Sequence, residues 1–192
     1  MMTATEIFKD IVKREIHREG IDDLMGWLEV TDFFKAPAST RFHEAFEGGL
    51  VLHSINVYSH LVRLNEMYKI GYTKESIAIA ALFHDVCKAD CYKVSMKNVK
   101  DEETGVWRKE PYYTFNEDFK FGGHGSKSVY LVQNFMKLTP DEATAINCHM
   151  GVENAKWEVC DAHRACPLAF LLHTADMAST VPALNEEVTC SE

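Results

Sequence analysis

The sequence predicts a single, mainly α-helical domain with one small β insertion. Three observations carry this prediction: amphipathic helical spacing recurs along most of the chain, one segment alternates instead, and the composition is that of a soluble globule. Of the 192 residues, 46% are hydrophobic and 26% are charged. A chain of this length is most simply one domain that buries about 70% of its unfolded surface. We therefore expect one domain over residues 1–192.

The N-terminal segment, residues 1–32, predicts helical structure that precedes the core. In residues 3–19, isoleucine and valine side chains recur on one stripe with charged side chains opposite, which is typical of an amphipathic helix. Gly20 is a suitable residue to end that helix. Residues 21–32 predict a short helical or turn segment.

The predicted core, about residues 33–180, begins with a loop and continues as helices. Residues 33–49 hold a proline and a Gly-Gly pair, which is typical of a loop with one helical turn. The apolar helical patterns that follow begin at capping residues or end at glycines in several cases. They cover residues 50–70, 73–86, 122–138, 139–149 and 166–182.

One stretch departs from the helical pattern. Residues 92–121 alternate, are rich in Val, Tyr, Trp and Phe, and contain a polar DEETG turn, so they predict a β-hairpin inserted between helices. Its aromatic side chains either stack on a base as a lid or substrate wall, or simply cover the bundle. Residues 152–165 predict a loop, and residues 185–192 predict a polar tail.

Candidate metal ligands gather at the ends or edges of the helical patterns. In the stretch AALFHDVCKAD, an apolar helix delivers the adjacent His84 and Asp85, and Lys88 follows one turn later. A desolvated carboxylate must be paired or metal-bound, although a lone His-Asp pair could also face solvent at a helix end. The other candidate ligands are His53, His124, His149 and Asp176.

Together these side chains predict a metal site. Helical bundles build such sites from inward-facing side chains of several helices. Four imidazoles and two carboxylates exceed the needs of one tetrahedral site and suffice for two metals that share Asp85. His173 lies three residues before Asp176 and is its rival as a ligand. His60 shares a helix face with His53 and is either a supporting residue or a core histidine.

The order of these ligands resembles the HD superfamily of metal-dependent phosphohydrolases. The entry segment FFKAPASTRFHEAFEGGLVLHSINV also resembles that of the HD domain in bacterial 3'-to-5' exoribonucleases, although their OB-fold is missing here. The resemblance spans roughly Phe33 to Ala178 and implies an HD-domain helical bundle. The positions that carry it are His53, His84, Asp85 and Asp176, with His124 and His149 as the extra pair of the binuclear branches.

The resemblance also implies a reaction and a set of roles. One metal would take His53, His84, Asp85 and Asp176, while His124, His149 and the shared Asp85 would take a second. A hydroxide between the metals would attack a phosphoester, with Asp85 and Lys88 as the catalytic residues and Lys88 also binding a phosphate oxygen. Further candidate substrate contacts are Arg41, Lys127 and Ser128, for which a solvated or connecting role is the alternative.

Charge and composition limit the partners. A net charge of -9 argues against an extended nucleic-acid surface, whereas a local site for a nucleotide, a short oligonucleotide or a phosphorylated metabolite is allowed. Histidine-rich ligation favours one or two Fe, Mn, Co, Ni or Zn ions over Mg. The apolar stretches are too short for a membrane span. Six cysteines without CxxC spacing or a signal peptide predict a reducing cytoplasm.

Two other functions stay open at this point. Di-iron oxygenases related to myo-inositol oxygenase use a similar ligand set, so oxidative cleavage with iron is the first alternative. A non-catalytic protein that holds a nucleotide or a structural metal is the second. Six candidate ligands argue against a purely structural metal, because such a site needs only a closed shell of four. No heptad pattern or long apolar seam predicts an oligomer.

Overall fold

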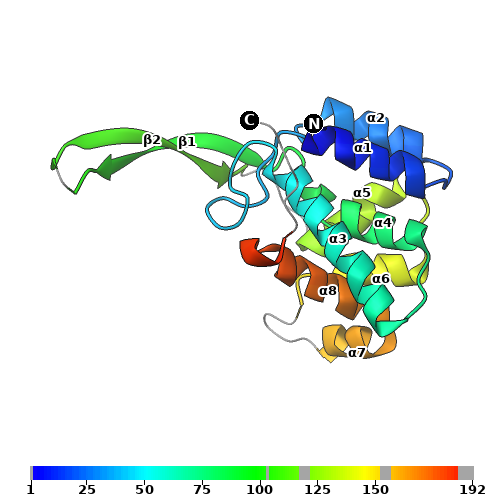
Figure 1. Cartoon of the computed structure of the whole chain (residues 1–192). Coiled ribbons are helices and arrows are strands. Elements are labelled where there is room, and N and C mark those ends of the chain that lie inside the picture. Colours follow the sequence, from blue (N-terminus) through cyan, green and yellow to red (C-terminus); the bar gives the residue numbers. More distant parts are fainter. Residues whose placement is uncertain (1, 103, 117–121, 152–156, 186–192) are drawn as a thin grey trace.

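The structure is a computed structural model that describes residues 2–102, 104–116, 122–151 and 157–185 (Figure 1). The described residues form eight α-helices, two short 3-10 helices and one β-hairpin, so the predicted mainly α fold is confirmed. The elements in chain order are α1 (Ala4–Glu15), α2 (Ile21–Val30), α3 (Gly49–Tyr68), α4 (Lys74–Phe83), η1 (Val86–Lys88), β1 (Tyr92–Lys100), β2 (Trp107–Phe115), α5 (His124–Gln133), α6 (Pro140–Cys148), α7 (Trp157–Ala165), α8 (Pro167–Ser179) and η2 (Pro182–Leu184).

Helix α4 lies in the middle of the bundle, packed against α1, α3 and α6. Its sequence IAIAALF has no polar face, and every side chain from Ile77 to Phe83 is at most 2% exposed. A helix that is apolar all round is stable in water only when neighbouring helices cover it completely. The packing of α4 therefore fixes the position of the His84-Asp85 pair that follows it.

Helices α1 and α2 and the loop of residues 31–48 cover one end of this core. Phe8 of α1 is fully buried, and its ring centroid lies 5.5 Å from that of Phe33 and 6.0 Å from that of Phe83. Edge-to-face rings at these separations add attraction to the burial of apolar area. The loop that precedes α3 is therefore anchored against α4 by its first aromatic residue.

Polar side chains fix two of the helix starts. Thr3 and Glu6 form a capping box at the start of α1. Thr139 and Glu142 form a second capping box, and Pro140 is the first residue of α6. These contacts satisfy backbone amides that have no partner within the helix.

A buried ion pair joins α6 to the N-terminal part of the chain. Arg18, between α1 and α2, donates to the carboxylate of Glu142, and its guanidinium also lies 3.1 Å from Glu75 of α4. Burial alone would raise the pKa of Glu142, but hydrogen bonds from Arg18 and from the Thr139 amide outweigh it and lower that pKa. The side chain of Glu142 is fully buried and ionised.

The prediction of a loop over residues 152–165 is wrong for its second half. Residues Trp157–Ala165 form α7, which packs on α8. Within it, the His163 ring stacks on the His173 ring with centroids 5.5 Å apart. The rest of the predicted loop, and the predicted tail from residue 186 onward, lie outside the described residues.

The predicted hairpin is confirmed. Strands β1 and β2 pair antiparallel from Tyr92 opposite Phe115 to Lys100 opposite Trp107. The hairpin projects away from the helices as a long arm (Figure 1). Residues 117–121, the last part of the predicted insertion, lie outside the described residues. None of the helices in the described part of the chain is long and apolar enough to cross a bilayer.

Candidate metal centre

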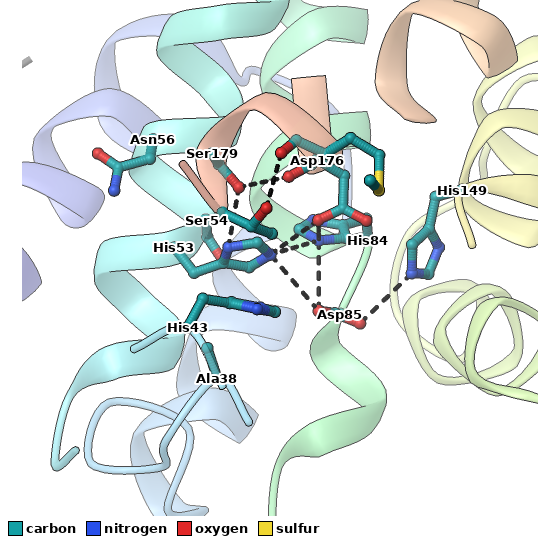
Figure 2. Close-up of polar contacts among 12 residues, drawn as sticks. Ala38, His43, His53, Ser54, Asn56, His84, Asp85, His149, Asp176 and Ser179 are labelled. Carbon is teal, nitrogen blue, oxygen red and sulfur yellow. Dashed lines mark hydrogen bonds and ion pairs between the residues drawn. The ribbon is translucent and has the colours of Figure 1, made fainter. Parts of the chain in front are cut away.

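Five of the six predicted metal ligands converge at the centre of the bundle (Figure 2). His53 comes from α3, Asp176 from α8 and His149 from the end of α6, while His84 and Asp85 follow α4. The closest atoms are His53 Nε2 and Asp176 Oδ1, 3.1 Å apart, and the Nε2 atoms of His53 and His84, 3.3 Å apart. Asp85 lies 3.4 Å from both His84 Nε2 and His149 Nε2, through a different carboxylate oxygen each time.

Main-chain carbonyls orient two of these imidazoles. His84 Nδ1 lies 2.7 Å from the Ala81 carbonyl oxygen, and His149 Nδ1 lies 2.7 Å from the Ile146 carbonyl oxygen. A carbonyl oxygen can only accept, so Nδ1 carries the proton in both rings. Each ring therefore directs its Nε2 to the centre, which is how histidine ligands of metals are commonly held.

The centre holds two ionised carboxylates and one buried ammonium group. Asp85 is 3% and Lys88 is 9% exposed, and Lys88 Nζ lies 2.6 Å from Asp85 Oδ2. Burial would raise the pKa of Asp85, but Lys88 and His84 outweigh it and hold that pKa well below its usual value. Burial is likewise outweighed at Asp176, where the hydrogen bond with His53 lowers the pKa. The two carboxylates therefore outnumber the one ammonium group at the centre.

The donor set fits divalent cations. Asp85 Oδ1 and His149 Nε2 are buried and have no hydrogen-bond partner. Two triads, His53-His84-Asp176 and His84-Asp85-His149, each place three ligand atoms within 4.8 Å of one another. Imidazole nitrogens with carboxylate oxygens suit Fe, Mn and Zn. A cation bound among these residues would pair the unsatisfied atoms, and the Nε2 of His84 would bind one cation only.

His124, the sixth predicted ligand, lies at the edge of this centre. It is the first residue of α5 and is half-buried, and its Nδ1 lies 3.7 Å from Cys87 Sγ. Burial lowers its pKa, and the charge of Asp85 also acts on it. Within the described ranges, no triad of possible ligand atoms includes His124. Its role as a ligand stays a prediction.

Gly125 allows the backbone of α5 to pack closely against the backbone of α6. A Cβ added to Gly125 would lie 2.3 Å from the Asn147 carbonyl oxygen, so only glycine permits this approach of the two backbones. His124 and His149 flank this contact in the sequence, one residue before Gly125 and two after Asn147. The close packing therefore sets how far the two histidines stand from each other.

The predicted substrate contacts lie in different places. Lys88 is in the centre, where it also donates to the Ala38 carbonyl oxygen at 2.7 Å. Ser128 is buried and accepts the Cys87 amide at 3.2 Å, so it holds η1 in place. Lys127 is partly buried. Arg41 is exposed, and its guanidinium carbon lies 5.0 Å from the centroid of the Phe42 ring.

Two residues of the same loop, which the sequence did not single out as ligands, do face the centre. The His43 ring lies 4.9 Å from the His53 ring, and Glu44 Oε2 lies 3.9 Å from His53 Nδ1. His43 Nε2 and Glu44 Oε2 are both buried without a hydrogen-bond partner. Burial lowers the pKa of His43 to about 4 and raises the pKa of Glu44. A loop has no periodicity that would tell which side chains point inward.

The two other histidines considered near these ligands, His173 and His60, form hydrogen bonds with groups other than the metal-ligand side chains. His173 Nδ1 donates to the His149 carbonyl oxygen at 2.7 Å, and His60 Nε2 lies 2.9 Å from Asn185 Oδ1. Of the two rivals on α8, Asp176 contacts His53 and His173 does not; Ser179 of the same helix also lies 3.1 Å from His53 Nδ1. Cys87 is fully buried, and burial raises its pKa to about 12, so its thiol stays protonated. That protonation excludes Cys87 as a thiolate nucleophile near neutral pH.

Comparison with known proteins agrees with this arrangement. The model of the family described as "HD domain" matches residues 50–181, well over half of the chain. Over 58 residues the chain is 36% identical to the dihydroneopterin 2',3'-cyclic phosphate phosphodiesterase of Methanocaldococcus jannaschii. That match covers 28% of this chain and 23% of the archaeal enzyme, so it spans less than a quarter of the relative. No solved structure matches the chain significantly.

Proposed function

This chain belongs to the HD-domain family, and we propose that it is a metal-dependent phosphohydrolase that acts on a small phosphorylated substrate. One observation carries the proposal: two triads of possible metal ligands share His84 and meet around Asp85 and Asp176 in a buried centre. A purely structural site needs one closed shell of four ligands, and this centre offers more. The 36% identity over 58 residues to a phosphodiesterase supports the same reaction class.

Asp85 and Lys88 would have different roles in the proposed hydrolysis. Bound divalent cations would supply activation of water and stabilisation of the charge on the phosphoryl group. Asp85, held ionised by Lys88 and His84, reaches toward both triads through its two oxygens. Lys88 keeps a positive charge at the centre, because Asp85 raises its pKa against the effect of burial. The ammonium group would bind a non-bridging phosphate oxygen as a point charge.

We infer that the substrate is a phosphodiester or phosphomonoester of a nucleotide, a short oligonucleotide or a phosphorylated metabolite. The net charge of -9 disfavours long nucleic acids. The nitrogen-rich ligand set favours one or two ions of Fe, Mn, Co, Ni or Zn, with Asp85 as the ligand shared by two ions. His124 would complete the second position together with His149. The kinship with exoribonuclease HD domains stays a prediction from the entry segment alone.

Metal analysis joined to a substrate panel tests the proposal. The wild-type protein, loaded anaerobically with Mn, should hydrolyse at least one of 2',3'-cyclic nucleotides, dinucleotides, bis(p-nitrophenyl) phosphate or p-nitrophenyl phosphate. Asp85→Asn should lose bound metal and turnover together. Asp161→Asn is the matched control, because the Asp161 side chain is 68% exposed on α7.

Three outcomes would contradict the proposal. Full turnover by Asp85→Asn would remove Asp85 from the reaction. Oxygen consumption by the iron-loaded protein, without phosphoester hydrolysis, would favour an oxygenase of the myo-inositol oxygenase type. Full metal occupancy without turnover on any phosphoester would favour a binding protein.

A further inference from the structure

The candidate metal ligand His53 is held through its second ring nitrogen by the end of α8. Its Nε2 faces the centre, 3.1 Å from Asp176 Oδ1, whereas its Nδ1 lies 3.1 Å from the hydroxyl oxygen of Ser179 (Figure 2). His53 and Ser179 are both fully buried, and Ser179 is the last residue of α8. The imidazole therefore lies between the candidate metal centre and a buried hydroxyl group.

The two hydrogen bonds of the Ser179 hydroxyl decide which nitrogen of His53 carries a proton. The hydroxyl donates to the main-chain carbonyl oxygen of Asp176 at 2.7 Å, and a carbonyl oxygen can only accept. Because a hydroxyl has a single hydrogen, the bond to His53 then requires a hydrogen on Nδ1. With Nδ1 protonated, Nε2 is the nitrogen of His53 that can bind a cation.

A nearby carboxylate is a poorer partner for Nδ1 of His53. Glu44 Oε2 lies 3.9 Å from His53 Nδ1, which is beyond hydrogen-bond distance. The other carboxylate oxygen of Glu44 lies 3.5 Å from Asn56 Nδ2. The Ser179 hydroxyl, at 3.1 Å, is therefore the group that fixes the ring of His53.

Ser179 is in turn held by Asn185 and His60. Asn185 Nδ2 donates to the Ser179 carbonyl oxygen at 2.8 Å, and Asn185 Oδ1 lies 2.9 Å from His60 Nε2. Because the carbonyl oxygen of Ser179 can only accept, the NH₂ group of Asn185 must face it, and the amide oxygen faces His60. His60 is 8% exposed and lies two helical turns after His53 on the same face of α3. Helix α3 is therefore joined to the end of α8 twice, directly from His53 and through Asn185 from His60.

This support differs from that of the other two buried imidazoles. His84 and His149 each bond to a carbonyl oxygen three residues earlier in the chain, so local helix geometry is enough to orient them. The hydroxyl that contacts His53 belongs to a residue 126 positions later. The orientation of His53 therefore depends on how the end of α8 docks against α3.

We propose that Ser179 is a positioning residue for the candidate metal ligand His53, and that Asn185 and His60 hold Ser179 in place. The hydrogen-bond partner of a ligating imidazole fixes the orientation of the ring and the nitrogen that binds, and its loss weakens metal binding about 10–100-fold. The same hydroxyl contacts the main chain of Asp176, so it touches one candidate ligand from α3 and one from α8. The inference rests on the metal centre of the proposed function, but not on phosphoester turnover.

Zinc binding, measured by competition with a chromophoric chelator, tests the proposal without any assay of hydrolysis. Ser179→Ala should raise the Kd for zinc about 10–100-fold. Asn185→Ala, which removes the outer contacts only, should raise it by a smaller factor. Ser54→Ala is the matched control and should leave the Kd unchanged. Ser54 is also fully buried and follows His53 directly, but its hydroxyl donates to the Leu50 carbonyl oxygen at 3.0 Å.

Nuclear magnetic resonance of the histidine side chains separates a positioning role from a general loss of structure. The zinc-loaded protein is diamagnetic, and the wild type should show an Nδ1–H signal of His53 that is protected from exchange with water. Ser179→Ala should lose this protection, whereas the Nδ1–H signals of His84 and His149 should remain, because main-chain carbonyls accept from them. Far-UV circular dichroism should show the same helical content in the wild type and all three variants.

Four results would contradict the proposal. A wild type that binds no zinc, or a Ser179→Ala variant with wild-type affinity, would overturn it outright. An equal loss of affinity in Ser54→Ala would show that any buried hydroxyl near His53 has the same effect. A protected Nδ1–H of His53 in Ser179→Ala would make Glu44 the partner instead. Wild-type affinity in Asn185→Ala would remove the outer support. Zinc binding with the expected pattern but no phosphoester hydrolysis would refute the proposed function and support this inference.

Discussion

Replacing Lys88 with methionine should destabilise the metal-free protein much more than the metal-loaded protein. The Lys88 ammonium lies 2.6 Å from Asp85 Oδ2 and donates to the Ala38 carbonyl oxygen at 2.7 Å. Without metal, the variant leaves Asp85 as a buried carboxylate without its cation, which costs about 3–5 kcal/mol. With metal, the cations compensate Asp85, and the loss of the bond to Ala38 alone costs about 1 kcal/mol.

Urea unfolding followed by far-UV circular dichroism measures this difference. The wild type and Lys88→Met are compared in EDTA and in excess Mn, and Lys13→Met on the exposed surface of α1 is the control. The free energy of unfolding should fall by about 3–5 kcal/mol in EDTA and by about 1 kcal/mol in Mn. Equal losses in both conditions would refute the reasoning that the ammonium and the cations compensate the same carboxylate.

Three further variants test other contacts. His43→Ala should keep the wild-type metal content but lower kcat/KM about tenfold, because it removes a buried polar group that faces the centre; unchanged kinetics would exclude contact with substrate. Glu142→Gln should lower the free energy of unfolding by about 3 kcal/mol at pH 7. Burial alone would raise the pKa of Glu142, but Arg18 lowers it, so this stability is present above the unfolded value of 4.5 and is lost as the pH falls through the folded value. Denaturation curves that show a pH-independent difference would argue against the ion pair. Gly125→Ala should destabilise the protein by about 1–3 kcal/mol in thermal unfolding, because the new Cβ would lie 2.3 Å from the backbone of α6, and an unchanged melting temperature would disprove that close contact.

The sequence predicted the helices well where periodicity and end signals agree. The apolar run before His84 can only be a covered helix, and its end then aims the His-Asp pair into the core. The alternation and polar turn of residues 92–121 likewise predicted a hairpin, and the structure adds the register of its two strands. Helix α7 was missed, because its nine residues, WEVCDAHRA, have no continuous apolar stripe.

The candidate centre was predictable to the extent that its members lie on helices. Asp176 was preferred to its neighbour His173, and the structure brings the aspartate to His53. The loop before α3 behaves differently, since no periodicity tells which of its side chains point inward. Arg41 and His43 were both possible contacts, and the family resemblance favoured Arg41, whereas His43 and Glu44 are the loop residues that approach His53.

The bonds from His84 and His149 to the carbonyls of Ala81 and Ile146 have a consequence for metal exchange. Each ring is held by a hydrogen bond to the last turn of the helix that precedes it. The main chain therefore fixes the direction of each Nε2 whether or not an ion is bound. Chelation should leave this geometry standing, and a different ion can enter without a refolding step.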